Sequence, residues 1–188
     1  MRVGLLGGSF NPAHQGHIHA SEQALKQLRL DYVWWLVSPQ NPLKATRGMV
    51  SFAKRLEAAR GLSRHPRIVV TGIEKTLGTR FTIDTLRALR RRFPGIRFVW
   101  LMGSDNLVQV PRWRNWQAIF CLVPVAVVAR TGSALDSRVS KAATRFKAAF
   151  RPADSSFAEA KPPALTILDA KRDPTSATGL RAASTSRS

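Results

Sequence analysis

Residues 7–17 read GGSFNPAHQGH, and the surrounding chain is interpreted outward from this stretch. An apolar run at residues 3–6 precedes it and predicts a buried strand, and apolar residues with helical spacing follow it from Ile18 to Leu28. A strand, a glycine-containing turn and a helix N-terminus form anion sites in α/β proteins, because the first amides of a helix have no partners within it. We therefore expect a phosphate site here, with Gly7 and Gly8 allowing the backbone to approach a ligand closely.

Two histidines distinguish this stretch from better-known phosphate-binding loops. It contains neither the G-x-x-x-x-G-K-[ST] pattern of a P-loop nor the G-x-G-x-x-G pattern of a dinucleotide-binding fold. His14 and His17 are three residues apart where the turn becomes the helix, so both imidazoles can donate hydrogen bonds to a phosphoryl group. Two other interpretations stay open at this point: helix capping by the histidines, and a metal site that also includes His19.

The composition is typical of one folded domain. Of the 188 residues, 44% are hydrophobic and 8% are aromatic, which is enough for a full core. Lys and Arg number 30 against 11 Asp and Glu, a formal charge of +19 that invites a nucleic-acid hypothesis. The basic residues are scattered apart from Arg90–Arg92, and no zinc-finger spacing or aromatic RNA-binding signature occurs. We expect no nucleic-acid partner and interpret the charge as a surface that favours polyanionic small substrates.

The sequence also indicates where in the cell the protein is located. The single cysteine, Cys121, excludes an intramolecular disulfide and fits a reducing environment. Met1 and Arg2 lead straight into a short apolar run, so we expect no signal peptide. No apolar run approaches the ~20 residues of a membrane helix. We therefore expect a cytoplasmic protein with no membrane partner, and the oligomeric state stays open.

Strands and helices are expected to alternate along the chain. Further strands are predicted at 32–37, 67–70, 96–102, 123–129 and 164–168, and further helices over 49–62, 82–92 and 136–150. Thr82 is expected to be the N-cap of the helix that it begins. This alternation predicts an α/β fold, a Rossmann-like doubly wound parallel sheet in a single domain. The domain is expected to span residues 1–181, with a frayed tail at 182–188.

Other candidate residues follow the predicted strands at their carboxyl ends, where ligands bind in open α/β sheets. Lys44 lies in a proline-containing loop and could reach the same phosphates as the histidines, or could be an ordinary surface lysine. Gly103 and Asp105 follow the fourth strand, where the carboxylate could accept from ribose hydroxyls, lie near magnesium, or cap the next helix. Trp113, in the run RWRNW, could stack on a flat ligand or pack in the core.

The opening stretch resembles the (H/T)-x-G-H nucleotidyltransferase superfamily in its form G-G-[ST]-F-[DN]-P-x-H-x-G-H. This resemblance implies nucleotidyl transfer with release of pyrophosphate. The later motifs are similar to those of the nicotinate-nucleotide adenylyltransferase family: LGTRFTIDTL (77–86), GSDNL (103–107), RWRNW (112–116) and SATGLR (176–181). They imply that ATP and nicotinate mononucleotide are the substrates and that deamido-NAD and pyrophosphate are the products.

The resemblance also implies roles for individual residues. Those expected to carry the phosphate chemistry are His14, His17, Lys44 and Arg181. Those expected to contact ATP are Gly7, Gly8, Ser9, Phe10, Gly103, Asp105, Ser176 and Thr178. Those expected to bind the nicotinate nucleotide are Thr82, Arg112 and Trp113. Mg²⁺ is expected as the cofactor, bound through the ATP phosphates and without a ligand set from protein side chains.

Three positions depart from the family's pattern. Pro111 stands where histidine is common, Thr131 stands where proline is common, and Gly179 lies inside the last motif, where glycine costs a helix about 1 kcal/mol. None of these removes a side chain assigned to phosphate chemistry, so activity is expected. Two alternatives stay open: an adenylyltransferase that uses phosphopantetheine or nicotinamide mononucleotide, and a nucleic-acid-binding protein with steep salt dependence.

Overall fold

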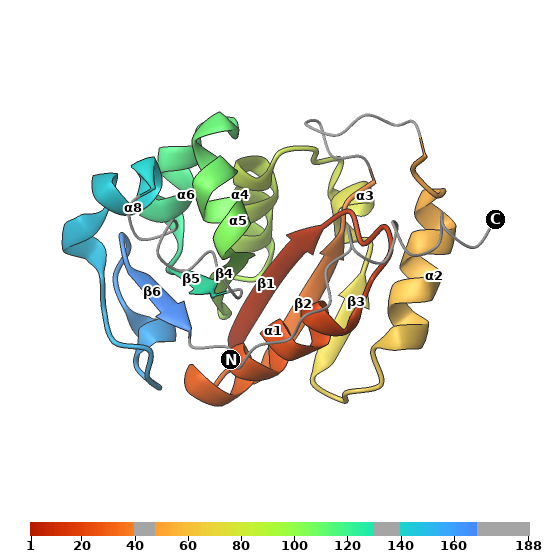
Figure 1. Ribbon diagram of the computed structural model, residues 1–188, viewed down its shortest axis with the longest axis horizontal. Helices are drawn as coiled ribbons and strands as arrows, with labels where there is room; N and C mark the ends of the chain where they lie inside the picture. The colour runs from red at the N-terminus through yellow and green to blue at the C-terminus, as the bar shows by residue number, and fades with distance from the viewer. Residues whose placement is uncertain (40–47, 130–139, 169–188) are drawn as a thin grey trace, which may run out of the picture.

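The computed structural model describes residues 1–39, 48–129 and 140–168. Within these ranges the apolar runs form six strands: β1 (Arg2–Gly8), β2 (Tyr32–Val37), β3 (Ile68–Thr71), β4 (Arg97–Gly103), β5 (Val125–Val128) and β6 (Leu165–Leu168). They form one sheet in the order β3-β2-β1-β4-β5-β6, and each pairing is parallel (Figure 1). This is the strand order of the Rossmann fold, so the predicted fold class is confirmed.

Helices connect the strands and cover both faces of the sheet. In the described ranges they are α1 (Gln15–Gln27), α2 (Phe52–Leu62), α3 (Ile73–Leu77), α4 (Thr82–Arg92), α5 (Ser104–Gln109), α6 (Trp116–Leu122) and α8 (Lys141–Arg145). Short 3-10 turns occur at η1 (Val110–Arg112), η2 (Lys147–Ala149) and η3 (Phe157–Glu159). Figure 1 shows α1 crossing in front of the sheet, whereas α4, α5 and α6 form a group on its other side.

Two hydrophobic cores lie on opposite faces of the sheet, and β4 contributes to both. Phe98, Trp100 and Met102 belong to one core, while Val99 and Leu101 belong to the other, because successive side chains of a strand point to opposite faces. The first core includes buried side chains of α4, α5 and α6, and the second includes those of α1 and α2. A strand that is buried on both faces has a continuous apolar sequence. The apolar run at 96–102 predicted β4 for this reason.

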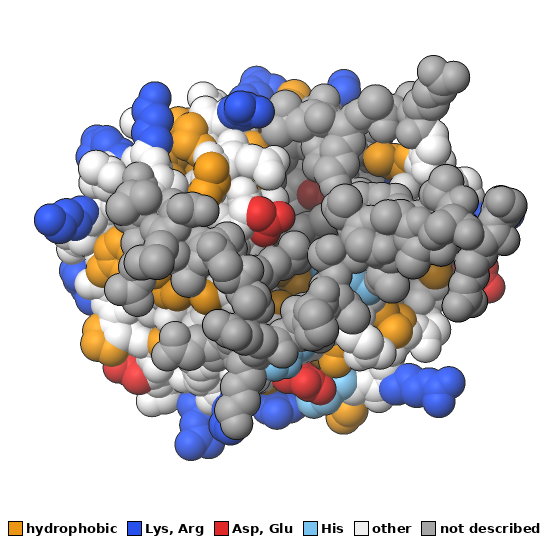
Figure 2. All heavy atoms as spheres, in the orientation of Figure 1, with side chains coloured by type: hydrophobic (Ala, Val, Ile, Leu, Met, Phe, Trp, Pro, Cys, Tyr) orange, Lys and Arg blue, Asp and Glu red, His pale blue; other side chains and the backbone are white. Residues whose placement is uncertain are grey.

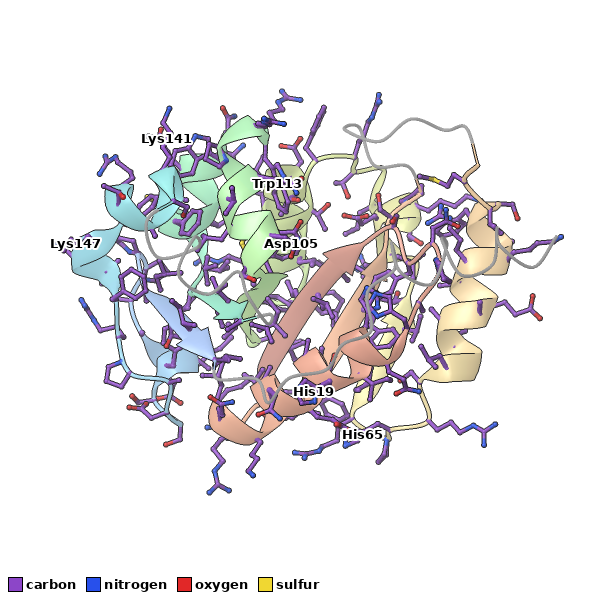
Figure 3. The ribbon with its side chains drawn as sticks, in the orientation of Figure 1. His19, His65, Asp105, Trp113, Lys141 and Lys147 are labelled. Carbon is purple, nitrogen blue, oxygen red and sulfur yellow. The ribbon has the colours of Figure 1, made fainter. Side chains whose placement is uncertain are left out.

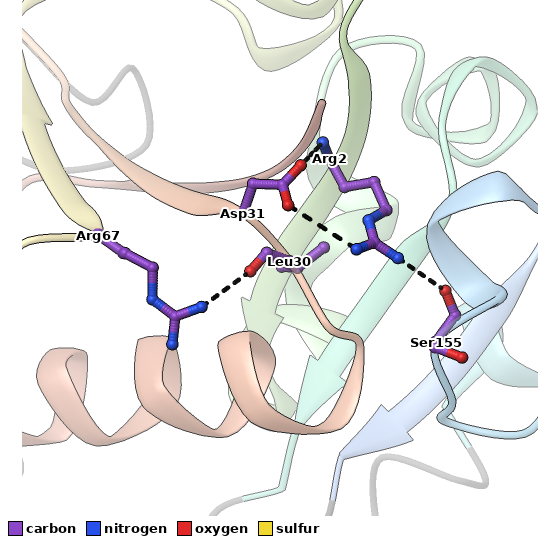
Figure 4. A network of polar contacts seen from close by, with 5 residues as sticks. All are labelled: Arg2, Leu30, Asp31, Arg67 and Ser155. Carbon is purple, nitrogen blue, oxygen red and sulfur yellow. Dashed lines mark hydrogen bonds and ion pairs between the residues drawn. The ribbon is translucent and has the colours of Figure 1, made fainter.

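Polar contacts join the strands at their amino-terminal ends (Figure 4). The Arg2 amide donates to Asp31 Oδ2 at 2.6 Å, and the Arg2 guanidinium lies 3.8 Å from Asp31 Oδ1. The same guanidinium donates to the Ser155 carbonyl oxygen at 3.4 Å, and Arg67 donates to the Leu30 carbonyl oxygen at 3.4 Å. These contacts lie at the edge opposite the carboxyl ends of the strands, where ligands of such sheets bind.

The structure corrects two helix predictions. Thr82 is not the N-cap of α4: Phe81 holds that position in extended geometry, and Thr82 is the first helical residue. The helix predicted over 136–150 does not run to Phe150. In the described part it is the short helix α8, which ends at Arg145 with Phe146 as its C-cap and is followed by η2. The Phe146 ring stacks on Phe120 with centroids 4.6 Å apart, and this core contact fixes the point where the helix ends.

The Lys and Arg side chains of the described residues are scattered over the surface. Figure 2 shows Lys and Arg side chains around the margin of one face and not in a single patch. The cluster Arg90–Arg92 lies in the last turn of α4, where cations interact favourably with the helix dipole. None of the helices in the described ranges has the length and apolar character needed to cross a bilayer.

Candidate active site at the carboxyl ends of the strands

The GGSFNPAHQGH stretch lies where the order of the strands reverses. β2 and β3 lie on one side of β1, whereas β4, β5 and β6 lie on the other. Gly7 and Gly8 end β1, and the chain then leads to His14, the N-cap of α1. Open α/β sheets bind their ligands outside the carboxyl ends of the strands at this position. The predicted phosphate site is therefore in the place where this fold binds ligands.

Both histidines of the motif cap the first turn of α1. His14 Nδ1 accepts from the Gly16 amide at 3.1 Å, and His17 Nδ1 accepts from the His14 amide at 3.2 Å. A neutral imidazole that accepts at Nδ1 carries its proton on Nε2, so this reciprocal capping box selects the Nε2–H tautomer of both rings. Helix capping through Nδ1 and phosphate binding through Nε2 would use different atoms of each ring, so the two roles are compatible.

Aromatic contacts fix the orientation of the His17 ring. Its centroid lies 4.7 Å from that of Phe10 and 5.8 Å from that of Trp35, and Phe10 stacks on Trp35 at 5.1 Å. Trp35 Nε1 donates to the buried Ser21 hydroxyl at 2.8 Å, and this hydroxyl donates to the His17 carbonyl oxygen at 2.8 Å. Phe10 is only 2% exposed, so any contact of this residue with ATP would involve its backbone.

Gly7 is required by packing inside the protein. A β-carbon at this position would lie 2.5 Å from Cη2 of Trp100, whereas one at Gly8 would lie 3.4 Å from Phe10, an ordinary contact. Trp100 is 3% exposed, its Nε1 has no hydrogen-bond partner among the described residues, and its ring meets that of Trp113 edge to face at 6.4 Å. Trp100 therefore connects the end of β1 to the segment at residues 110–115, called here the Trp113 loop. The sequence does not reveal this role, because Trp100 lies within an apolar strand.

Gly103 and Asp105 lie at the carboxyl end of β4, the neighbour of β1. Gly103 ends β4 and is the N-cap of α5, and Asp105 is exposed in the first turn of that helix. Gly103 has no side chain with which to cap α5. Figure 3 shows Asp105 and Trp113 on the side of the sheet where α5 lies. This carboxylate is in a position to meet a ligand at the switch point.

The start of α4 lies beside the Trp113 loop. Phe81 is the N-cap of α4 and has no side-chain acceptor with which to cap the first amides of this helix. The Arg114 guanidinium lies 4.8 Å from the Phe81 ring centroid and 3.9 Å from Asp84 Oδ2. Arg114 thus joins the loop that carries Trp113 to the helix that begins at Thr82.

The loop itself offers fewer backbone donors than its length suggests. The Trp113 amide donates to the Val110 carbonyl oxygen at 2.8 Å, and Pro111 has no amide hydrogen. Arg112 is exposed and Trp113 is half-buried. The groups in this region that could donate to an anion include the first amides of α4 and the Arg112 side chain.

A buried carboxyl group lies behind the start of α4. Glu74 in α3 is 7% exposed and accepts from the Thr85 hydroxyl at 3.0 Å, and Thr85 Oγ1 also lies 2.9 Å from Thr79 Oγ1. Burial raises the pKa of Glu74 to about 6, and hydrogen bonds with Thr85 and Ser38 partly oppose this rise. Since Ser38 follows β2, Glu74 connects the end of that strand to α4.

Some predictions fall on residues that the structure does not describe. They are Lys44, Ser176, Thr178 and Arg181, together with the departures at Thr131 and Gly179. Within the described ranges, no group of three or more His, Cys, Asp or Glu side chains could hold a metal ion. His14, His17 and His19 are thus not brought together as such a group, and Figure 3 shows His19 away from Asp105 and Trp113.

Comparison with known proteins identifies the family. A family model described as cytidylyltransferase-like matches residues 5–183. A probable nicotinate-nucleotide adenylyltransferase of Parvibaculum lavamentivorans is 53% identical over 185 residues, which cover 96% of this chain and 91% of that protein. A protein of the same name from Cereibacter sphaeroides is 57% identical over 182 residues, 97% of each chain. The chain belongs to the nicotinate-nucleotide adenylyltransferase family.

A solved structure with a related activity shares the fold. Plasmodium falciparum nicotinic acid mononucleotide adenylyltransferase complexed with NaAD has a TM-score of 0.68 and 14% identity, covering 94% of this chain and 77% of that one. The same protein complexed with APC gives a TM-score of 0.66. At this identity the likeness concerns the fold alone. The resemblance to nicotinate-nucleotide adenylyltransferases, drawn from motifs along the whole chain, is confirmed by the relatives.

Proposed function

We propose that this chain transfers the adenylyl group of ATP to nicotinate mononucleotide, giving deamido-NAD and pyrophosphate in NAD biosynthesis. The observation that carries the proposal is the position of His14 and His17, two imidazoles that accept backbone amides at Nδ1 in the helix start nearest the switch point. Relatives that cover nearly the whole chain are named for this activity. A protein of the same fold binds NaAD, which is the proposed product.

The proposed reaction is a direct in-line transfer. A phosphate oxygen of nicotinate mononucleotide attacks the α-phosphorus of ATP, and the bond from this phosphorus to the oxygen that bridges to the β-phosphate breaks. Pyrophosphate leaves with the electron pair of that bond. No protein nucleophile is needed, because the attacking phosphate is already ionised. Catalysis therefore consists of positioning and of stabilising the negative charge.

The phosphates are proposed to bind at the start of α1. His14 and His17 donate from Nε2, and the partial positive charge of the helix start adds to their effect. The backbone from Gly7 to Phe10 lines the same place. Four further residues are assigned to the triphosphate by family resemblance: Lys44, Ser176, Thr178 and Arg181.

We propose Mg²⁺ as the cofactor, held mainly through the ATP phosphates. Mg²⁺ usually keeps several waters and takes one or two carboxylates together with substrate phosphates. The described residues fit this mode, because they contain no side-chain cage for a metal but place the exposed Asp105 carboxylate at the end of β4. When bound, the ion would neutralise charge on the departing pyrophosphate.

The nicotinate nucleotide is proposed to lie between the start of α4 and Trp113. The first amides of α4, which begins at Thr82 without a side-chain cap, suit a carboxylate. Trp113 offers its ring to the pyridine, and Arg112 adds positive charge at the exposed side. An amide substrate would direct its own NH₂ donor toward these N–H groups, which would then lack acceptors.

We further propose that residues 1–181 form a single nucleotidyltransferase domain, with 182–188 as its tail. Both hydrophobic cores of the described residues pack on the same sheet, so these residues do not divide into two domains. The family match over residues 5–183 supports one continuous unit.

Product analysis tests the proposed function. The purified chain is incubated with ATP, Mg²⁺ and nicotinate mononucleotide, and products are identified by chromatography and mass spectrometry. We expect deamido-NAD and pyrophosphate in equal amounts, and no pyrophosphate when the nucleotide acceptor is omitted. Turnover with phosphopantetheine but not with nicotinate mononucleotide would contradict the proposal.

A further inference from the structure

Arg55 is a buried arginine with no acidic partner among the described residues. It lies near the start of α2 and is 2% exposed. Ion pairs within 4.0 Å among the described residues involve Arg2, Arg87 and Arg114, and Arg55 forms none. Burial lowers the pKa of its guanidinium. Because arginine is almost never fully buried unless it is paired, a specific set of partners must hold it here.

Its partners are four backbone carbonyl oxygens from three separate segments. Nη1 donates to the carbonyl oxygen of Ser9, in the loop after β1. It also donates to that of Ser38, after β2, and this second bond is 2.8 Å long. Nη2 donates to Pro39 at 2.9 Å, and Nε donates to Val50, just before α2, at 2.9 Å. One guanidinium therefore joins the loop after β1, the loop after β2 and the entry to α2.

Other hydrogen bonds join the same three segments. The Ser38 amide donates to the Gly8 carbonyl oxygen at 2.9 Å. Asn11 accepts from the Val50 amide at 3.3 Å and donates to the Gly48 carbonyl oxygen at 3.4 Å. The segments thus form one hydrogen-bonded unit with Arg55 at its centre.

Two of these segments carry the proposed phosphate-binding residues. Ser9 belongs to the stretch that continues to His14 and His17, and Pro39 precedes Lys44 by five residues in the sequence. We infer that Arg55 is a positioning residue for adenylyl transfer, which fixes the loop after β1 relative to the loop after β2 and so aligns the groups that hold ATP. This inference rests on the proposed function.

The chemistry of arginine explains why this residue suits the position. Its N–H groups form a planar fork of fixed geometry, so four bonds set the orientation of the segments as well as their distance. Its four carbonyl acceptors are neutral and bring no negative charge to this place. A carboxylate in their place would add negative charge next to a site for a triphosphate, where it would repel the ligand.

The first test separates geometry from charge. Arg55→Lys keeps the charge but cannot reproduce the fork, and Arg55→Met fills the space without donors. Arg60→Lys and Arg60→Met are matched controls, because Arg60 is exposed in the same helix. For Arg55→Lys we expect kcat to fall about 10- to 100-fold, because a misplacement of about 1 Å can cost ~100-fold, while KM for nicotinate mononucleotide changes less than about threefold. The Arg60 variants should match the parent chain.

Hydrogen–deuterium exchange provides a readout that does not depend on the reaction. We expect faster amide exchange at residues 9–14 and at Ser38 in both Arg55 variants and in neither Arg60 variant. Unchanged kcat and exchange in Arg55→Lys would overturn the inference. A failure of Arg55→Lys to fold, or a loss of activity that only follows its unfolded fraction, would also overturn it by showing a general structural role. If exchange changes as expected but the parent chain makes no deamido-NAD, the proposed function fails and the hydrogen-bonded unit stands.

Discussion

At the scale of single residues, we propose different roles for the two ring nitrogens of His17. Nδ1 accepts from the His14 amide at 3.2 Å, and the proposed phosphate contact uses Nε2. Asparagine can replace the Nδ1 acceptor but has no donor at the position of Nε2. We expect His17→Asn to keep the fold, as judged by circular dichroism, and to lower kcat about 10²- to 10³-fold, the usual cost of one lost donor to developing charge. Turnover equal to that of the parent chain would remove His17 from the phosphate site.

The contact between Gly7 and Trp100 yields a prediction about stability. In Gly7→Ala the new β-carbon would lie 2.5 Å from Trp100 Cη2, so the ring must move within a packed core. We expect the free energy of unfolding to fall by about 1–3 kcal/mol, measured by urea denaturation. Gly8→Ala is the control, because its β-carbon would lie 3.4 Å from Phe10. Equal stabilities of the two variants would show that Trp100 does not exclude a side chain at residue 7.

At the scale of secondary-structure elements, α3 and α4 are joined by the buried Glu74 carboxyl. Its pKa is raised to about 6 from an ordinary value of 4.5, because burial disfavours the charged form. Between these two pH values the unfolded chain loses the proton and the folded chain keeps it. The stability that Glu74 contributes is therefore fully present below pH 4.5 and is lost as the pH rises through about 6.

Glu74→Gln tests this linkage, because glutamine cannot ionise. From pH 4.5 to above pH 6, we expect the free energy of unfolding of the parent chain to fall by about 2 kcal/mol relative to that of the variant. Denaturant titrations of both proteins across this range measure the difference. Parallel stability curves would mean that the Glu74 pKa is the same in the folded and unfolded chains.

The sequence predicted elements better than it predicted the contacts between them. Apolar runs and helical spacing are local signals, and they located the strands of the described sheet. The N-cap of α4 was misplaced by one residue because Phe81, which cannot cap through its side chain, holds a position where Thr82 has the better chemistry. The helix α3 was missed because its five residues are too few to show a period.

The candidate site shows the same limit. His14 and His17 could be predicted because their motif is contiguous in the chain. Arg55 could not, since it bonds to Ser9, 46 residues away in the sequence, and nothing in its local pattern distinguishes it from a surface arginine. Trp100 was hidden in an apolar strand, and Glu74 acquires its raised pKa only through burial.

At the scale of the whole molecule, the proposed site draws on both ends of the chain. Arg181 is assigned to the ATP phosphates although it lies outside the described residues. We expect deletion of residues 176–188 to raise KM for ATP, and deletion of 183–188 to have little effect, as measured by steady-state kinetics. Equal losses from the two deletions, with a matching loss of thermal stability, would mean that the tail acts through folding and not through the phosphates.

Selectivity between two acceptors tests the central claim most directly, because it depends on adenylyl transfer and on the nicotinate site together. The measurement is kcat/KM for nicotinate mononucleotide and for nicotinamide mononucleotide, at saturating ATP and Mg²⁺. We expect the acid to be preferred at least about 100-fold, because the amide leaves N–H donors at the start of α4 without acceptors. A ratio near one, or a preference for the amide, would contradict the assignment of Thr82 and Trp113 to a carboxylate site.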